Sequence, residues 1–519
     1  MNASDGLRIS AWKYPEKTAA VYFDKRCTYA ECDERVNRLA NGLGERGFKR
    51  GDKIAYLLYN CMEGLEIIQA LLRAGITLVP INYRLSPEHM EYIINHCDAT
   101  CLFLGADLLE TVDPLMPKLK NIPRNNYIIV GGTAPKGMST YEDVLSESAA
   151  NPEADVRPTD LAYIAYTSGT TGLPKGVVTY SCALMANMRG AVYRGYGRGE
   201  IRAEDRVLLV LMPLVHSNSI WSTCITFWYG GKNVIYRSRG FDAEEVLQVI
   251  DVEKVTTSSV VPYMLTRILD LPEEARSKYD VSSITSIGSG SAMLYPSVID
   301  KMLRYFTGVR LSNSYGSSET GPATTLRYSE LTKKPGSIGR PIPGVEVRVL
   351  NNDGNELPPG EIGEIWVKSE QRFEGYYKDA EKTVAAIRGE WACAGDLGYT
   401  DEEGYFYLVD RGDDTIVSAG ERISSPEVEN VISKNLKVAE VAVIGVPDER
   451  WGMCCTAVVK LKEGEEATEV EIIEYCRAEL SAFQVPKKVD FVTEFPTTLT
   501  GKILKRVLRE WYAKKARGQ

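Results

Sequence analysis

The residues best suited to chemistry lie in the stretch 166–178, "YTSGTTGLPKGVV", which contains three glycines, four Ser or Thr hydroxyls and one lysine. Backbone N–H groups and hydroxyls of such a loop can surround an anion. Glycine permits close approach and unusual φ values, and lysine adds a mobile positive charge. The composition therefore predicts a phosphate-binding loop. Taken alone, the stretch is equally consistent with a surface loop that binds nothing.

Two common phosphate-binding motifs are excluded by spacing. Counting four residues on from Gly169 or Gly172 does not reach a Gly-Lys-Ser/Thr sequence, so this is not the usual nucleoside-triphosphate loop. "GSGSAM", which begins at Gly288, lacks the last glycine of a dinucleotide-binding fingerprint. Any phosphate bound here is thus held by a different type of site.

Four further motifs follow the loop along the chain: "NSYGSSETG" (313–321), "GEWACAGDLG" (389–398), "DRGDDTIVSAGERISSPEVE" (410–429) and "PTTLTGKILKRVLR" (496–509). Together with the loop, and in the same order, they resemble the signatures of the adenylate-forming superfamily. This superfamily includes acyl-CoA synthetases, luciferases and peptide-synthetase adenylation domains. The resemblance covers nearly the whole chain and is greatest to AMP-forming acyl-CoA synthetases.

The resemblance implies a ligase that joins a carboxylic acid to coenzyme A. ATP first converts the acid to an acyl-adenylate with release of pyrophosphate, and the thiol of CoA then displaces AMP. Activation of this kind splits one hard acyl transfer into two easier steps. Two other activities stay open: loading of a carrier protein by a stand-alone adenylation enzyme, and a non-catalytic role in nucleotide binding. Intact Lys175, Glu319, Asp396 and Lys502 argue against the non-catalytic role.

The resemblance also assigns residues to ATP. Lys502 would reach the charge that develops between the carboxylate and the α-phosphate, and Glu319 would hold Mg²⁺, a hard cation that prefers carboxylate oxygens. The β- and γ-phosphates would be held by Thr167, Ser168, Gly169, Thr170, Thr171, Gly172 and Lys175, with Thr170 also counted as catalytic.

The nucleoside and CoA have candidate residues as well. Tyr315 would stack on adenine and Asn313 would offer its amide, while Asp396 and Arg411 would contact the ribose. Gly420 would let the thin pantetheine arm of CoA pass. The remaining candidates for the nucleotide site are small residues: Ser289, Gly290, Ser291, Ser314, Gly316 and Ser318.

The acyl pocket is predicted around "HSNSIW" (216–221), where His216 would abut the bound carboxylate and act in catalysis. Ser217, Asn218 and Ser219 would make one wall more polar than a simple fatty-acid pocket, and the absence of an acidic residue here counts against amino acids. Medium-chain, aryl and polar-substituted acids stay open. The predicted pocket residues are His216, Ser217, Asn218, Trp221, Val261, Gly290, Gly316 and Gly321.

The chain departs from the family pattern at a few positions. Ala394 replaces a threonine before Gly395 and Asp396, and Ala419 replaces the first glycine of the usual Gly-Gly pair in the hinge segment. Neither change removes a charge that the mechanism requires. Ala419 would narrow or re-aim the CoA channel, so the identity of the thiol acceptor stays open.

The elements that must position these residues alternate between helix and strand. Helical periodicity at 29–47 and 64–75 alternates with short apolar runs at 53–59 and 77–82, and the pattern returns between 207 and 262. Such alternation predicts an α/β fold with parallel sheets covered by helices on both faces.

Three units are expected. Residues 1–411 would form a large N-terminal α/β domain, within which 339–410 reads as a small β-rich subdomain because of its alternating apolar residues and Asp-Gly turn. Residues 412–519 would form a small, mobile α+β lid domain. The resemblance places the hinge at Asp413, and a swing about it would exchange the two half-reactions.

Composition limits the partners. The net charge of −9 is spread along the 519 residues, which argues against nucleic-acid binding. The longest apolar run, 207–215, is too short to span a bilayer, and no signal peptide is visible at the start, so we expect a cytoplasmic protein without stable membrane insertion. The expected ligands are a small carboxylic acid, ATP, Mg²⁺ and CoA. Oligomeric state is not readable from the sequence, and a homodimer stays open.

Overall fold

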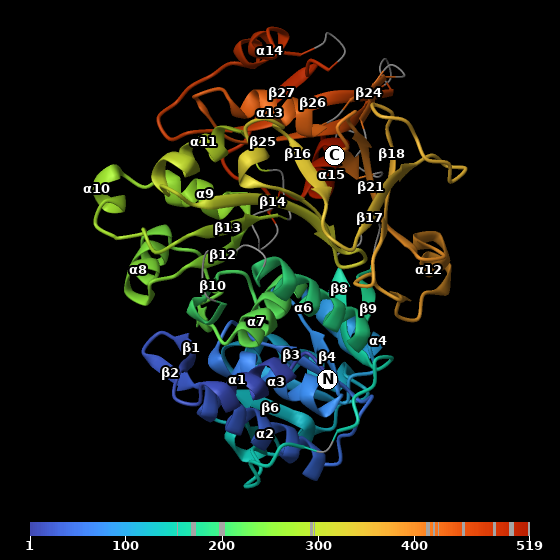
Figure 1. The fold of residues 1–519 in the computed structure, drawn as a ribbon. Coiled ribbons are helices and arrows are strands. Elements are labelled where there is room, and N and C mark those ends of the chain that lie inside the picture. Colours follow the sequence, from blue (N-terminus) through green and yellow to red (C-terminus); the bar gives the residue numbers. More distant parts are fainter. Residues whose placement is uncertain are drawn as a thin grey trace.

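A computed structural model describes most of the chain: residues 1–152, 154–167, 173–196, 203–290, 294, 296–411, 416–418, 421–423, 425–448, 452–480, 484–497 and 503–516. Three sheets organise these residues, with fourteen, eight and five strands (Figure 1). The α/β class predicted from the alternation of helices and strands is confirmed.

The eight-stranded sheet lies at the bottom of Figure 1 and is parallel through most of its width, from β8 to β7. Its inner strands β4 and β6 are buried along their whole length and β3 and β5 at all but one residue, as expected of parallel strands covered on both faces. In sheet order the strands are β19 (Gly375–Tyr376), β9 (Lys175–Tyr180), β8 (Leu161–Thr167), β4 (Thr77–Pro80), β3 (Lys53–Leu57), β5 (Cys101–Gly105), β6 (Tyr127–Val130) and β7 (Ser139–Thr140).

Helices before and between these strands begin and end at residues that cap them. α2 begins after a capping box, in which Thr28 and Glu31 each bond the other's backbone N–H, and α3 ends at Gly75 in the left-handed region. The helices of this part are α1 (Asp5–Lys13), α2 (Tyr29–Glu45), α3 (Met62–Ala74), α4 (Pro87–His96) and α5 (Leu109–Val112).

The fourteen-stranded sheet changes character at β14. It is parallel from β1 to β14 and antiparallel beyond β14. Its order is β17 (Glu346–Leu350), β18 (Gly363–Lys368), β21 (Trp391–Thr400), β22 (Phe406–Arg411), β16 (Ser337–Pro341), β15 (Gly321–Leu326), β14 (Arg310–Ser317), β13 (Ser286–Ser289), β12 (Thr257–Val260), β10 (Val207–Val210), β11 (Lys232–Ile235), β1 (Thr18–Tyr22) and β2 (Lys25–Thr28), with β20 (Ile387–Arg388) on β21.

The β-rich segment is continuous with this sheet through β16, which pairs with β15 on one side and β22 on the other. Gly339 makes this close pairing feasible: its φ is +89°, and a Cβ there would lie 2.0 Å from the carbonyl carbon of Thr325. The helices of this part are α6 (Ser181–Tyr196), α7 (Ser217–Tyr229), α8 (Ala243–Glu253), α9 (Pro262–Leu269), α10 (Glu273–Arg276), α11 (Pro296–Tyr305) and α12 (Ala380–Ala386).

The five-stranded sheet contains the C-terminal strands, coloured orange to red at the top of Figure 1. It has its own hydrophobic core, and Lys505 Nζ forms a 2.8 Å ion pair with the buried carboxylate of Glu429. The elements are β23 (Ile416–Ser418), β24 (Glu421–Ile423), β25 (Val438–Asp448), β26 (Gly452–Leu461) and β27 (Lys488–Phe491), with α13 (Ser425–Ser433), α14 (Glu469–Arg477) and α15 (Lys505–Ala516).

Helices α6 and α7 lie between the two larger sheets in Figure 1 and join them through one hydrophobic cluster. Within that cluster, Leu184 of α6 and Phe227 of α7 share a core with Tyr56 of β3 and Val210 of β10. The start of α7 and the end of β10 are therefore held rigidly by packing.

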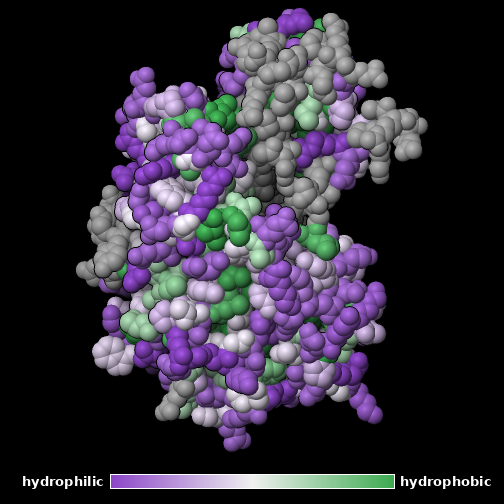
Figure 2. Space-filling view, turned by 90° about the vertical axis from the view of Figure 1, so that its right-hand side faces the viewer, coloured by the Kyte–Doolittle hydropathy of each residue, from purple (hydrophilic) through white to green (hydrophobic). Residues whose placement is uncertain are grey.

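The molecular surface is mostly polar on the face shown in Figure 2, with hydrophobic residues gathered near its middle. Among the residues that the structure describes, no helix is both long enough and apolar enough to cross a membrane.

Candidate active site

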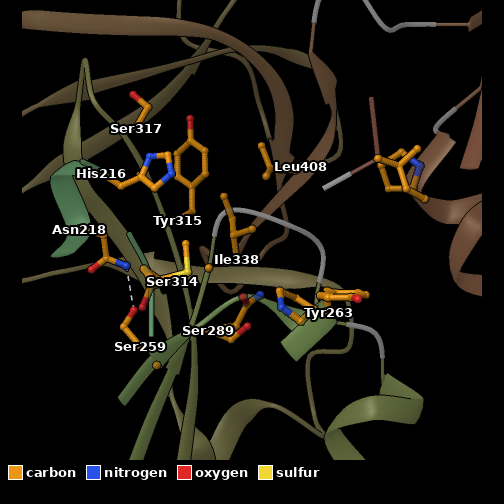
Figure 3. A pocket seen from close by; sticks show the side chains of 18 of the residues that line it. His216, Asn218, Ser259, Tyr263, Ser289, Ser314, Tyr315, Ser317, Ile338 and Leu408 are labelled. Atoms are coloured by element: carbon orange, nitrogen blue, oxygen red, sulfur yellow. Dashed lines mark hydrogen bonds between the residues drawn. The ribbon is translucent and has the colours of Figure 1, made fainter. Parts of the chain in front are cut away.

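A cleft of about 2760 Å³ opens at the carboxyl ends of β12, β13 and β14 and beside the first turn of α7 (Figure 3). Side chains of the C-terminal part, including Glu429, Lys434 and Ile503, line it as well. Ligands of open α/β sheets bind at the carboxyl ends of parallel strands, and the cleft lies at that edge.

The predicted phosphate loop connects two antiparallel strands of the eight-stranded sheet. Thr167, the last residue of β8, lies directly opposite Lys175, the first residue of β9, and both line the cleft. The Lys175 ammonium lies 5.3 Å from the centre of the Tyr376 ring, close enough for a cation–π contact. Residues 168–172 of the loop lie outside the described residues.

The end of β8 is held from behind by an aromatic cluster. The Tyr166 hydroxyl is 2.7 Å from His96 Nδ1, and the His96 ring stacks on Tyr92 with 5.0 Å between ring centres. Tyr377 meets His96 edge-on, so the cluster also holds the segment next to β19. Burial lowers the pKa of His96, which favours its neutral form. The residue before Thr167 is thus fixed by contacts with α4 and, through His96, with the segment next to β19.

Glu319, the predicted Mg²⁺ ligand, lies between β14 and β15 and is only 8% exposed. Its Oε1 accepts a 3.1 Å hydrogen bond from the Tyr376 hydroxyl. Since the same tyrosine ring lies under Lys175, one side chain brings the predicted metal ligand and the predicted phosphate-binding lysine together.

Tyr315 and Asp396, assigned to adenine and ribose, are also brought together. The Tyr315 hydroxyl donates a 2.8 Å hydrogen bond to Asp396 Oδ2, and both side chains are buried. Asp396 lies on β21, and its Cα is opposite that of Arg411 on β22. A β-bulge after Tyr315 requires glycine next in the chain, because a Cβ on Gly316 would lie 2.4 Å from the carbonyl oxygen of Gly321.

Other predicted nucleotide residues lie on the same strands. Asn313 lines the cleft but donates its amide N–H to the Ser337 carbonyl at 3.2 Å, a structural role that the sequence did not predict. The Ser314 hydroxyl is 3.1 Å from that of Thr325. The small residues that line the cleft as predicted are Ser289, Gly290, Ser314, Gly316 and Ser318.

His216 precedes the first residue of α7 and lines the cleft (Figure 3). Its Nε2 is buried without a hydrogen-bond partner among the described residues, and the Ser217 hydroxyl is in the same condition. Burial, with a smaller contribution from the charge of Arg84, lowers the pKa of His216 to about 4. The imidazole is therefore neutral at pH 7, and its Nε2 is available to a ligand.

The first turn of α7 divides its polar side chains between cleft and core. Asn218 lines the cleft and donates a 2.8 Å hydrogen bond to the Ser259 hydroxyl (Figure 3), whereas Ser219 donates to the Met212 carbonyl and is buried. The prediction that Ser219 forms part of the polar wall is wrong. Trp221 lines the cleft, with its indole N–H held by Tyr163 at 2.8 Å.

Two predicted pocket residues lie away from the cleft. Val261 packs in the hydrophobic core behind β12, and Gly321 faces Gln371, whose Cβ would be 2.9 Å from a Cβ placed on that glycine. The next residue in each case, Pro262 and Pro322, lines the cleft instead. In both cases the prediction is wrong by one position in the sequence. The direction of a side chain near a strand end depends on local turns that the sequence does not specify.

Several predicted residues lie outside the described residues: Ser168, Gly169, Thr170, Thr171, Gly172, Ser291, Asp413, Gly420 and Lys502. Their roles stay predictions. Of Arg411, the structure describes only its place in β22.

Among the cleft residues that were not predicted, two form hydrogen bonds to predicted residues. Tyr376 bonds Glu319 from a strand that pairs with β9, and Ser259 accepts from Asn218 at the end of β12. Neither stands next to a recognisable motif. Both contacts join segments more than 40 residues apart, so no local pattern could indicate them.

The AMP-binding enzyme family matches residues 7–377, and the AMP-binding enzyme C-terminal domain matches residues 427–502. The chain belongs to the AMP-binding enzyme family. Membership confirms the resemblance to the adenylate-forming superfamily and makes the protein an adenylate-forming acid ligase by family.

Relatives of this AMP-binding enzyme cover almost its whole length. It is 31% identical over 519 residues to an indoleacetate–CoA ligase of Aromatoleum aromaticum, covering 99% of each chain. It is 29% identical to a fatty acid–[acyl-carrier-protein] ligase of Streptomyces coeruleorubidus, covering 96% of this chain and 93% of the relative. A crystal structure of an anthranilate CoA ligase with anthranoyl-AMP matches with a TM-score of 0.91 and 26% identity, over 100% and 98% of the two chains.

Proposed function

We propose that the protein is an ATP-dependent carboxylic acid–CoA ligase that makes acyl-CoA through an acyl-adenylate and releases AMP and pyrophosphate. The observation that carries the proposal is the convergence of three sets of groups on one cleft: Lys175 and Glu319 at Tyr376, the Tyr315–Asp396 pair, and His216, whose Nε2 has no hydrogen-bond partner within the described part of the chain. We assign these sets to the triphosphate, the nucleoside and the acid, respectively.

In the first step, a carboxylate oxygen forms a bond to the α-phosphorus of ATP, and the bond from that phosphorus to pyrophosphate breaks. Such transfers depend on positioning and charge neutralisation. Asp396 would accept hydrogen bonds from the ribose hydroxyls. The hydrogen bond that the Tyr315 hydroxyl donates to Asp396 fixes the orientation of this carboxylate. His216 is neutral, and none of the described residues bonds its Nε2, so it would donate through Nε2 to the acid's carboxylate if its proton resides on that nitrogen.

Glu319 fits a role in holding Mg²⁺. It presents a buried carboxylate on the cleft wall, and Mg²⁺ in phosphate-transferring enzymes is held by one or two carboxylates together with substrate phosphates. When bound, the ion supplies positive charge that neutralises the phosphates. The hydroxyl of Tyr376 holds the Glu319 carboxylate in place, and Lys175 adds a second positive charge on the same side.

In the second step, the thiol sulfur of CoA bonds to the acyl carbon, the thiol proton is released and AMP leaves. The C-terminal part would move between the steps about Asp413, bringing Lys502 to the cleft in the first and the segment around Gly420 in the second. Residues 429, 433–436, 438–442 and 503–505 line the cleft, which is consistent with a lid that works against this face.

Two facts favour CoA as the acceptor and aryl acids among the substrates. The indoleacetate and anthranilate relatives are both CoA ligases, and the match to each extends over nearly the full chain. The second candidate is loading of a carrier protein, which is favoured by the fatty acid–[acyl-carrier-protein] ligase of similar identity.

Pyrophosphate release with a panel of carboxylic acids, measured with and without CoA, tests the proposal. We expect slow release without CoA and fast turnover with an acyl-CoA product once CoA is added. Adenylation that produces no acyl-CoA, but acylates a phosphopantetheinylated carrier protein, would establish the second candidate. No pyrophosphate release with any acid would overturn both.

A further inference from the structure

The acyl side of the cleft contains more polar groups than binding a carboxylate requires. His216 can serve the carboxylate itself, but Ser217, Asn218, Ser259 and Ser289 also line this region. The hydroxyls of Ser217 and Ser289 are buried without a hydrogen-bond partner among the described residues, and Ser289 is only 2% exposed. Buried polar groups normally have partners, because an unsatisfied one is costly. A ligand with polar groups of its own would supply them.

The Asn218–Ser259 pair is the most organised of these groups. The amide N–H of Asn218 donates to the Ser259 hydroxyl at 2.8 Å, which joins the first turn of α7 to the end of β12 (Figure 3). An amide has two N–H donors and an acceptor oxygen, and a serine hydroxyl that accepts one bond still has a proton to donate. The pair can thus both donate to and accept from a neutral group.

The backbone around the pair is rigid. His216, two residues before Asn218, is positioned by the packing of α7, whose side chains Ile220, Cys224 and Phe227 are fully buried. Ser259 is set by the parallel pairing of β12 with β13, where its Cα lies opposite that of Gly288. Because both partners stand on packed elements, their hydrogen bond is preorganised for recognition.

We propose that this pocket selects acids that carry a neutral hydrogen-bonding group, a hydroxyl or an amino substituent, away from the carboxylate, and that Asn218 and Ser259 read that substituent. The inference rests on the proposed function, since it concerns the acid of the same reaction. An alkyl chain would remove the pair from water and offer no hydrogen bond in return, so the site disfavours it. A second carboxylate is disfavoured as well, because the pair has no charge to offset it.

The test compares matched acids that differ in one substituent: benzoate with 3- and 4-hydroxybenzoate and with 4-aminobenzoate, cinnamate with 4-hydroxycinnamate, and octanoate as the alkyl acid. The readout is kcat/KM for pyrophosphate release with each acid. We expect the wild-type enzyme to favour at least one substituted acid over its parent by about 10-fold, because sites that hydrogen-bond a substituent discriminate against acids that lack it.

Asn218→Leu and Ser259→Ala should each lower that preference by about 3- to 10-fold, the effect of one neutral hydrogen bond. The double variant should lose only slightly more of the preference than the more affected single variant, because the two residues act as one pair. Ser222→Ala is the matched control: it lies on the same helix and donates to the Ser219 carbonyl. It should leave the preference unchanged.

The outcomes separate the two levels of the argument. If no acid supports pyrophosphate release, the proposed function is wrong. If acids are activated but parent or alkyl acids are used as well as substituted ones, the substrate class is wrong and the ligase proposal stands. If the preference exists but neither Asn218→Leu nor Ser259→Ala reduces it, these two residues do not read the substituent. Ser259→Ala covers the case in which Asn218→Leu does not fold.

Discussion

The low pKa of His216 gives a quantitative prediction. Replacing His216 by phenylalanine keeps a ring of similar size and removes the titrating group. In the wild-type protein, burial lowers the pKa of His216 from its ordinary value of 6.5 to about 4. At pH 6 this side chain should be only about 1% protonated, whereas an ordinary histidine would be about 76% protonated. Any fall in enzymatic activity as the pH is lowered towards 5 should therefore not arise from protonation of His216.

The same shift makes stability depend on pH. As pH falls from 6.5 towards 4, the unfolded chain takes up a proton at His216 and the folded chain does not, so the folded state loses stability through this window. Linkage gives a loss of about 2 kcal/mol at pH 5 relative to pH 7.5. His216→Phe should lack this loss. The difference in unfolding free energy between variant and wild type should therefore move by about 2 kcal/mol in favour of the variant on acidification.

Two measurements check this. The chain has only three histidines, so an NMR titration of labelled imidazoles shows three signals, and the one missing in His216→Phe identifies His216. Denaturant unfolding of both proteins at pH 5 and 7.5 supplies the stability difference. His89, a partly exposed residue of the cleft wall, gives the control variant His89→Phe. A His216 signal that titrates near 6.5, together with equal pH dependence of stability in variant and wild type, would refute the reasoning.

Four further predictions concern the proposed mechanism. Glu319→Gln should raise the Mg²⁺ concentration needed for half-maximal pyrophosphate release at least 10-fold, as measured by metal titration; an unchanged requirement would exclude Glu319 as a ligand. Tyr315→Phe removes a hydrogen bond to the carboxylate of Asp396 and should raise KM for ATP about 10- to 100-fold, with little change in KM for the acid. Lys502→Ala should slow adenylation by about 10²- to 10³-fold yet still convert added acyl-adenylate to acyl-CoA. Asp413→Pro should do the reverse, and an equal loss of both half-reactions would contradict a hinge there.

Much of the fold could be predicted from periodicity. Apolar runs predicted the parallel strands β3, β4 and β10, and amphipathic periods predicted α2 and α3. The sequence did not indicate that the β-rich segment would extend the long sheet through β16. Strand pairing between distant segments depends on tertiary packing, and a short strand such as Ser337–Pro341 has no periodic signal of its own.

The candidate site was predictable where a motif concentrates chemistry in one segment. Lys175, Glu319, Tyr315 and Asp396 line one cleft, as the motifs imply. Predictions were wrong where the direction of the side chain decides whether a residue lines the cleft. Ser219, Val261 and Gly321 are within one residue of the cleft wall but face elsewhere. A helical turn presents successive side chains about 100° apart, so a run of three polar residues cannot all face one cavity.

The parallel pairing of β1 with β11 delays the completion of this part of the sheet while the chain is being synthesised. Val21 of β1 lies opposite Val234 of β11, so β1 cannot pair with β11 until more than two hundred further residues have left the ribosome. At typical elongation rates this takes roughly 10–40 s. Throughout that interval the β1–β2 hairpin presents an unpaired edge, and a nascent chain halted before Lys232 should be open to proteases and chaperones along it.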